Sequence, residues 1–370
     1  MKNFDYWDKQ FKAGNMSAFN TDARGLLWLK LKSIIRKDFV PQFAQHANLN
    51  VSGQGLTESF ASMFAVLSEN NADAHALLDD FIRAQNNQQS TVLDIEKLVS
   101  ELYKLRHFDW GGDYQNALDK FLVSRFVKTD DPSYEKLLSK FDTEINPAVR
   151  GYVLNSWYNY WSSVLIENIF KSHPFVLPAI GKIKSVDFFI QTLPFDLKVT
   201  YFPSEFLTKM RKEKGYPVEF TFLKQKAREA RIHYDKDASP DVITHEIREK
   251  MRDSQNDVCL AALETLQTEN KTILDESIKN PQNLTQWLYE NQGEMRFGSE
   301  NRIYLILVDA NDFKNSWKLK RNINLLKPVI TEYLDKFSLS EMMEKRITFT
   351  FKGKPGTFSA LADTLFVVTK

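Results

Sequence analysis

The sequence predicts an α/β protein of two lobes, the first helical and the second built on a mixed β-sheet flanked by helices. Its 370 residues exceed what one hydrophobic core usually serves. One-sided apolar stripes of helical period fill residues 1–150, whereas apolar, β-branched segments appear only after Pro147. We therefore divide the chain into a helical lobe, residues 1–150, and an α/β lobe, residues 151–370.

The apolar stripes of the first lobe predict four amphipathic helices. They cover residues 23–43, 57–70, 72–85 and 91–105. The next segment, HFDWGGDY (107–114), contains two glycines and predicts a loop. Asp109 and Asp113 in this loop could bind a ligand, although a solvated turn is the commoner role for such acids. The role of this lobe in binding DNA, docking a partner or forming a dimer is left open.

The second lobe alternates between helical and extended patterns. Asn155 or Ser156 can cap a helix that runs to Lys171 and ends before His173-Pro174. The patterns that follow are three apolar strand segments (FVLPAIGKI, SVDFFI and FDLKVTYF), a charged helical region over 204–280, a buried strand over 301–309, an amphipathic helix over 315–337 and terminal strands around a turn at 353–356. This order is typical of an α/β or α+β lobe.

Composition and missing motifs restrict the class of protein. A net charge of +1 excludes a uniformly basic surface, so a nucleic-acid site must be a local patch. The single cysteine, Cys259, excludes an intramolecular disulfide and a cysteine-rich zinc site, and its helical surroundings predict a buried thiol. There is no HExxH, P-loop or dinucleotide-binding motif. The polar N-terminus and the absence of a long apolar run predict a soluble, cytoplasmic protein.

Three charged residues interrupt the strand segments over 185–200, SVDFFIQTLPFDLKVT. Because side chains alternate along a strand, Asp196 and Lys198 share one face, while the opposite face is apolar. A turn near 191–194 should bring Asp187, on the preceding strand, across from this polar face. Charges in core strands are costly unless they are paired or bound to a metal ion.

Two carboxylates beside a lysine have a chemical use. Mg²⁺ prefers oxygen ligands and is often held by one or two acids together with a substrate phosphate. A nearby lysine can orient the attacking water or stabilise charge on a phosphoryl oxygen. Glu167, on the preceding helix, offers a third acid among apolar neighbours, or else lies on the polar side of that helix near Lys171. The competing interpretation is a structural ion pair between Lys198 and one aspartate.

The order of Glu167 on a helix, Asp187 on a strand and Asp196-Leu197-Lys198 on the next strand resembles the active-site signature of the PD-(D/E)xK, or restriction-endonuclease-like, nucleases. The resemblance covers residues 155–201 and departs from the commoner pattern in having Val186 before the aspartate and an aspartate, Asp196, where glutamate is more frequent. It implies a restriction-endonuclease-like core over residues 151–370, with a mixed central sheet, and metal-dependent hydrolysis of phosphodiester bonds.

The resemblance also implies a role for each residue of the motif. Asp187 and Asp196 would bind Mg²⁺ or Mn²⁺, joined by the main-chain carbonyl of Leu197. Lys198 would act on the nucleophilic water, and Glu167 would support the metal or its waters. The implied function is an endodeoxyribonuclease of the restriction or host-defence type, with DNA as its partner. A homodimer is attractive because cutting two strands calls for two active centres.

A local basic region follows the motif. Residues 198–236 contain ten Lys and Arg against five Asp and Glu, a net charge of +5. The residues expected to contact nucleic acid are Lys209, Arg211, Lys212, Lys224, Lys226, Arg228 and Arg231. An ordinary solvated helix face would have the same composition. For the second basic stretch, 314–321, the solvated face is the favoured interpretation.

A non-catalytic nucleic-acid or protein-binding module on the same fold is the alternative function, with the acids acting as structural pairs. An RNA nuclease is a third interpretation, because nothing in the sequence distinguishes RNA from DNA.

Overall fold

The computed structural model describes residues 2–53, 55–69, 71–106, 118, 122–128, 133–236, 240–293 and 297–369. The predicted loop over 107–114 lies outside these ranges. Contacts between residues divide the chain into two compact units. Unit 1 comprises Met1–Trp7, Phe19–Pro194 and Trp317–Phe337, and unit 2 comprises Asp8–Ala18, Phe195–Ser316 and Ser338–Lys370. Residue 150 lies inside unit 1, and the roles assigned to residues 1–150 and 151–370 remain predictions.

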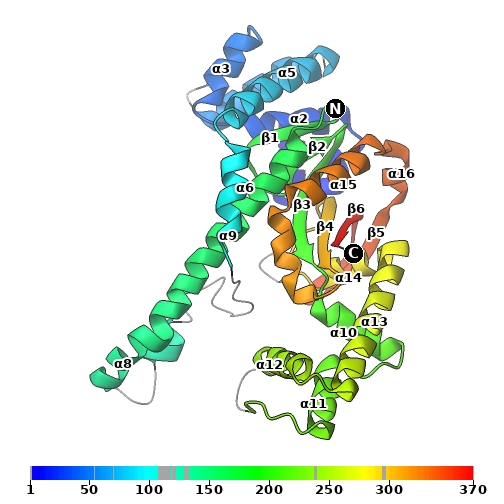
Figure 1. Ribbon diagram of the computed structural model, residues 1–370. Helices are drawn as coiled ribbons and strands as arrows, with labels where there is room; N and C mark the ends of the chain where they lie inside the picture. Colours follow the sequence, from blue (N-terminus) through cyan, green and yellow to red (C-terminus); the bar gives the residue numbers. More distant parts are fainter. Residues whose placement is uncertain are drawn as a thin grey trace. The chain divides into compact units, whose positions relative to one another are not determined.

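Unit 1 is mainly helical and also contains two strands (Figure 1). Its elements are α2 (Ala23–Ile34), α3 (Phe39–His46), α4 (Leu56–Leu67), α5 (Asn71–Ser90), α6 (Ile95–Tyr103), the π-helical η3 (Val123–Val127), α8 (Tyr134–Lys140), the π-helical η4 (Phe141–Ile145), α9 (Asn146–Lys171), β1 (Val176–Ile183), β2 (Val186–Ile190) and α15 (Ile323–Asp335). The helix α1 (Phe4–Lys12) and the 3-10 helices η1 (Met16–Phe19) and η6 (Phe313–Arg321) each have residues in both units.

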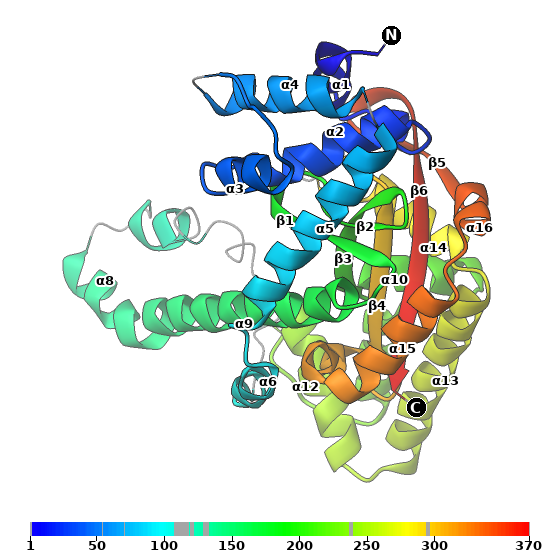
Figure 2. The same cartoon turned by 90° about the horizontal axis from the view of Figure 1, so that it is seen from above.

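Unit 2 combines helices with the remaining strands. Its elements are β3 (Leu193–Tyr201), α10 (Ser204–Glu213), α11 (Glu219–Glu229), α12 (Pro240–Asp253), α13 (Asp257–Lys279), α14 (Gln282–Glu290), β4 (Arg302–Asp309), α16 (Leu339–Glu344), β5 (Arg346–Phe351) and β6 (Lys354–Thr369). Figure 2 shows β4 and β6 side by side, as their pairing requires. The first two residues of β3 belong to unit 1.

The strands form an open, six-stranded mixed sheet in the order β1-β2-β3-β4-β6-β5. β1 and β2 are antiparallel, β4 is parallel to both β3 and β6, and β5 is antiparallel to β6. The predicted α/β class with a mixed sheet flanked by helices is therefore confirmed at this level. Seven of the eight residues of β4, from Arg302 to Val308, are buried, as expected for a central strand with both faces covered.

Two hydrophobic clusters stabilise unit 2. One joins α10, α13 and α14 to one face of β4, β5 and β6, through residues such as Phe206, Ile273 and Ile306. The other joins α11, α12 and α13, and it includes Cys259, which is fully buried as predicted. The first of these clusters reaches Tyr289 and Tyr304, next to the candidate site described below.

Several helix boundaries differ from the predicted ones. The single helix expected over 23–43 is two helices, because Pro41 would break an unbroken helix but is tolerated in the first turn of α3. The helix expected to start at Asn155 or Ser156 begins at Asn146, since Pro147 occupies its first turn. The helix expected over 315–337 is η6 followed by α15, which Asn322 caps by accepting from the N–H of Leu325.

None of the helices in the described ranges combines the length with the apolar composition that a bilayer-spanning segment requires.

Candidate active site

The Asp196-Leu197-Lys198 motif lies in β3 and projects its two charges from the same face of the strand. Nζ of Lys198 donates a hydrogen bond to the carboxylate of Asp196 over 2.7 Å. The two side chains differ in exposure: that of Asp196 is 11% exposed, while that of Lys198 is 46% exposed. The predicted alternation is therefore present, and a largely buried carboxylate lies beside a half-exposed ammonium.

A second cation, Arg302 on β4, also binds Asp196. The two residues are direct partners in the parallel register of β3 and β4, so their side chains leave the same face of the sheet. Nε of Arg302 donates to Oδ2 of Asp196 over 3.2 Å. The main chains are joined nearby, where the N–H of Asp196 donates to the carbonyl of Asn301. The sequence motif did not include this arginine.

The guanidinium of Arg302 is enclosed by further partners. Its Nη1 donates to Gln292 and to the hydroxyl of Tyr304, and its Nη2 donates to Glu300. The ring of Tyr289 lies 4.9 Å from its central carbon, within the range of a cation–π contact. Two acids, Asp196 and Glu300, and two cations therefore form a cluster in which the formal charges balance.

Burial and neighbouring groups together shift the pKa values of Arg302 and of the two tyrosines beside it. Burial raises the pKa of Tyr304 to about 12, although the neighbouring Arg302 acts in the opposite direction. Burial also raises the pKa of Tyr289 well above its usual value. Burial alone would lower the pKa of Arg302, but Tyr304, Tyr289 and Glu300 outweigh it and raise that pKa. Both tyrosines therefore stay neutral and the arginine stays charged at physiological pH.

The other two acids of the motif lie in unit 1. Glu167 is on α9, where it accepts a hydrogen bond over 2.7 Å from Lys171, one helical turn later. Its side chain is one-third exposed, so of the two placements that the sequence allowed, the polar side of the helix is the observed one. Asp187 is half-buried in β2. The structure thus brings Asp196 and Lys198 together, while their convergence with Glu167 and Asp187 remains a prediction.

The donor chemistry of the predicted metal ligands suits a hard cation. Asp187, Asp196 and the carbonyl of Leu197 all offer oxygen, which is the ligand atom that Mg²⁺ and Mn²⁺ prefer. In the described ranges, no group of three or more His, Cys, Asp and Glu side chains is arranged so that it could hold a metal ion.

The basic residues predicted to contact nucleic acid divide into two groups. Lys209, Lys212, Lys224, Arg228 and Arg231 are exposed on or just after α10 and α11, and Lys226 is partly exposed. Arg211 is only 1% exposed and donates to Pro217, Asn270 and Glu269. The burial of Arg211 does not support a phosphate contact, because its donors already join α10 to α13.

The second basic stretch also differs from its favoured interpretation as a solvated face. Lys320 and Arg321 are buried in unit 1. Lys320 donates to the side chain of Asn159, and burial lowers its pKa to about 8. Arg321 donates to the carbonyls of Leu102 and Leu105 at the end of α6. These cations therefore join η6 to α6 and α9.

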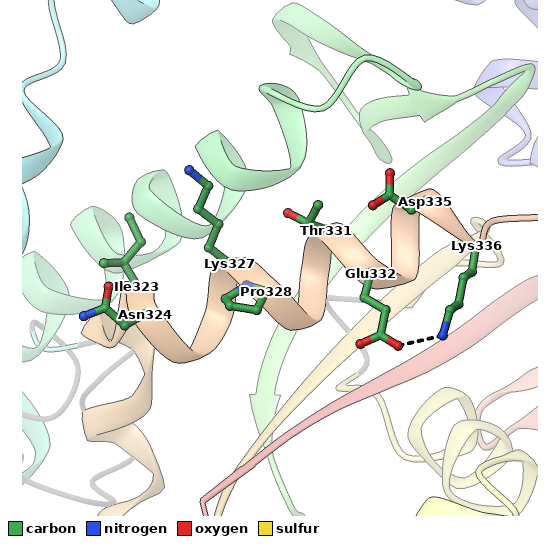
Figure 3. Close-up of a pocket in the computed structure, with 8 residues that line it drawn as sticks. All are labelled: Ile323, Asn324, Lys327, Pro328, Thr331, Glu332, Asp335 and Lys336. Atoms are coloured by element: carbon green, nitrogen blue, oxygen red, sulfur yellow. Dashed lines mark hydrogen bonds and ion pairs between the residues drawn. The ribbon is translucent and has the colours of Figure 1, made fainter.

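A shallow groove of about 690 Å³ follows α15 in unit 1 (Figure 3). Its lining residues come from this helix, and two of them, Glu332 and Lys336, form an exposed ion pair of 2.6 Å. Pro328 lies inside the helix and cannot donate a main-chain hydrogen bond there. A groove lined by one helix does not define a ligand site, so the Asp196–Lys198 pair remains the candidate.

Comparison of the chain with models of known families, with curated proteins and with solved structures finds no match.

Proposed function

We propose that the chain is a metal-dependent endodeoxyribonuclease of the restriction or host-defence type, with a restriction-endonuclease-like core. The observation that carries this proposal is the Asp196–Lys198 pair, a buried acid and a half-exposed lysine on one face of a sheet strand, with Nζ 2.7 Å from the carboxylate. The order of α9, β2 and β3 along the chain supports it, because Glu167, Asp187 and Asp196 fall on these elements in turn.

The connection between β2 and β3 supports the predicted approach of the two aspartates. Only Gln191 and Thr192 separate the strands, and Gln191 has a φ of 54°, as tight hairpin turns require. If the hairpin pairs outward from Ile190 and Leu193, Asp187 comes opposite Asp196. This pairing is part of the proposal.

In the proposed reaction, a water oxygen bonds to phosphorus as the bond from phosphorus to one sugar oxygen breaks, leaving a phosphate on one product and a hydroxyl on the other. Asp187, Asp196 and the carbonyl of Leu197 would hold Mg²⁺ or Mn²⁺, and Glu167 would support them. When bound, such a cation acidifies water and stabilises charge on phosphoryl oxygens. Lys198, which can turn towards solvent, orients the water or donates to the phosphate.

The test is cleavage of supercoiled plasmid, linear duplex DNA and RNA in the presence of Mg²⁺ or Mn²⁺. We expect metal-dependent cutting of DNA by the wild type, and a loss of about 10³-fold in Asp196→Asn and in Lys198→Met, within the usual range for electrostatic and acid–base groups. Lys198→Met is the more diagnostic variant because this half-exposed side chain contributes little to the core. Cutting RNA but not DNA would change the substrate class.

The matched control is the ion pair Glu332–Lys336 of α15, which has a similar separation of 2.6 Å. Glu332→Gln and Lys336→Met should cut DNA at the wild-type rate. If cutting survives Asp196→Asn and Lys198→Met unchanged, the assignment of these residues is wrong. Cutting that yields linear plasmid without a nicked intermediate would favour the homodimer, since both strands are then cut in one encounter.

A non-catalytic binding module is the second candidate, and the ion pairs favour it. Asp196 is already neutralised by Lys198 and Arg302, and Glu167 by Lys171, without a metal ion. On this alternative, the wild type binds DNA or a protein but cuts neither DNA nor RNA, whether Mg²⁺ or Mn²⁺ is added. Asp196→Asn then lowers the stability of the protein without changing any activity.

A further inference from the structure

Arg302 is a cation at the start of β4, and the six residues that follow it are uncharged. It is 4% exposed, and residues 303–308 of the same strand are all buried. A buried guanidinium is costly unless its donors are satisfied. In this protein its donors reach Asp196, Glu300, Gln292 and the hydroxyl of Tyr304, so the side chain is restrained by partners from several segments of unit 2.

The two cations that bind Asp196 differ in their freedom to move. The side chain of Lys198 is 46% exposed, and its ammonium lies at the end of a flexible aliphatic chain. The ammonium can therefore leave Asp196 for solvent or a substrate phosphate. The side chain of Arg302 is 5% exposed and makes additional contacts at both terminal nitrogens. Departure of Lys198 therefore leaves Asp196 bound to Arg302 rather than buried without a partner.

The contact with Arg302 also determines how the Asp196 carboxylate is oriented once Lys198 has left. Nε of Arg302 contacts Oδ2 of Asp196 from the adjacent position of the parallel register. A single directional hydrogen bond from a fixed group restricts rotation of the carboxylate about its terminal torsion, which is otherwise broad. The remaining lone pairs of the carboxylate then point in a defined direction.

We propose that Arg302 is the positioning residue of the site, holding the Asp196 carboxylate in place when Lys198 turns away to act on the substrate. The proposal rests on the proposed nuclease function, and it adds a residue that lies outside the sequence motif, on the neighbouring strand. Tyr304, Gln292 and Glu300 restrain Arg302 and so act on Asp196 indirectly.

The test compares Arg302→Lys with Arg211→Lys. Both arginines are buried in unit 2, ion-paired with a glutamate and hydrogen-bonded to side-chain amides, so both variants retain the charge and lose the planar fork. Binding of Mn²⁺ to the full chain, followed through the electron paramagnetic resonance signal of free Mn²⁺, gives a readout without catalysis. Plasmid cleavage gives kcat and KM.

We expect Arg302→Lys to weaken Mn²⁺ binding by about 10-fold and to lower kcat by a similar factor with KM for DNA unchanged, as is common when a partner of a metal ligand is lost. Arg211→Lys should lower the thermal midpoint but leave Mn²⁺ affinity and kcat at their wild-type values. Tyr304→Phe removes one acceptor from Arg302 at nearly constant volume and should shift both quantities in the same direction by less. If Arg302→Lys fails to fold, Tyr304→Phe alone tests the positioning role of Arg302.

Wild-type affinity and kcat in both Arg302→Lys and Tyr304→Phe would overturn the positioning role while leaving the nuclease proposal intact. Equal losses in Arg211→Lys and Arg302→Lys would also overturn it, because a general loss of packing would then explain both. A wild-type chain that neither binds Mn²⁺ nor cuts DNA would instead reject the proposed function, and the role of Arg302 with it.

Discussion

Asp196 is buried and contacts two cations that differ in exposure, the half-exposed Lys198 and the buried Arg302. Burying a second cation adds a desolvation cost, which the other hydrogen bonds of Arg302 offset. The observed arrangement gives Asp196 a fixed contact with Arg302 and a displaceable contact with Lys198. This difference is why the substitutions at Lys198 and at Arg302 are expected to have distinct effects on activity and on metal affinity.

Gly181 is a residue at which close packing leaves no room for a side chain. It lies in β1, and a Cβ atom at this position would overlap the main-chain oxygen of Ser33 in α2. A main-chain atom cannot rotate away as a flexible side chain can. Glycine is therefore required here by the close approach of a helix to a strand within unit 1.

We predict that Gly181→Ala destabilises the protein by about 1–3 kcal/mol or more, as overpacking of a close contact does. Chemical denaturation followed by circular dichroism should show a lower midpoint. Gly293→Ala is the control, because no atom lies within 4 Å of the added Cβ and its φ is not positive. A Gly181→Ala midpoint equal to that of Gly293→Ala would contradict the close contact.

At the scale of elements, helix ends are determined by single residues. Asp22 caps α2 by accepting from the N–H groups of Arg24 and Gly25, and its other oxygen pairs with Lys2 over 2.9 Å. Burial acts to raise the pKa of Asp22, but the hydrogen bonds from Lys2, Gly25 and Arg24 outweigh it and hold that pKa below its usual value of 3.8. The charged form is therefore the one that the folded state stabilises.

We predict that Asp22→Ala lowers stability by about 1 kcal/mol at neutral pH, the typical effect of losing an N-cap. Because the folded-state pKa is depressed, the ionic contribution is complete above the unfolded pKa and is lost as pH falls through the folded value. Urea unfolding at neutral pH and below pH 3.8 should therefore show a smaller difference between variant and wild type in acid. A difference that grows in acid would contradict this assignment of the cap.

At the scale of the whole molecule, net charge conceals a local asymmetry. The chain carries +1 overall, while the exposed cations on and after α10 and α11 belong to a region of net charge +5. Unit 2 contains this surface as well as Asp196, Lys198 and Arg302. Each exposed cation that contacts a phosphate should release a counterion on binding.

We predict that Lys212→Gln, Arg228→Gln and Arg231→Gln each weaken DNA binding to a similar degree on unrelated sequences. Each should also make the negative slope of log K against log salt shallower by about 1. Fluorescence anisotropy over a salt series measures both quantities. Lys271→Gln, an exposed lysine of α13 in the same unit and outside the predicted set, should change neither. If all four variants keep the wild-type slope, the DNA contact lies elsewhere.

Sequence pattern alone predicted the α/β class, most helices, the three strand segments before residue 201 and the Asp196–Lys198 face. These features depend on local periodicity, which neighbouring residues carry without reference to the rest of the chain. Helix boundaries at Pro41 and Pro147 were missed because a proline can either end a helix or begin one.

Tertiary structure decided the roles of the charged residues. Arg211, Lys320 and Arg321 looked like surface charges but are buried, because acceptors distant in sequence, such as Asn270, Asn159 and the carbonyl of Leu102, satisfy them. Arg302 joined the site only through the parallel register that places it beside Asp196. A single sequence lists ionisable groups, but the register and packing that pair them are long-range properties, and these decide which charges are buried, neutralised or free to act.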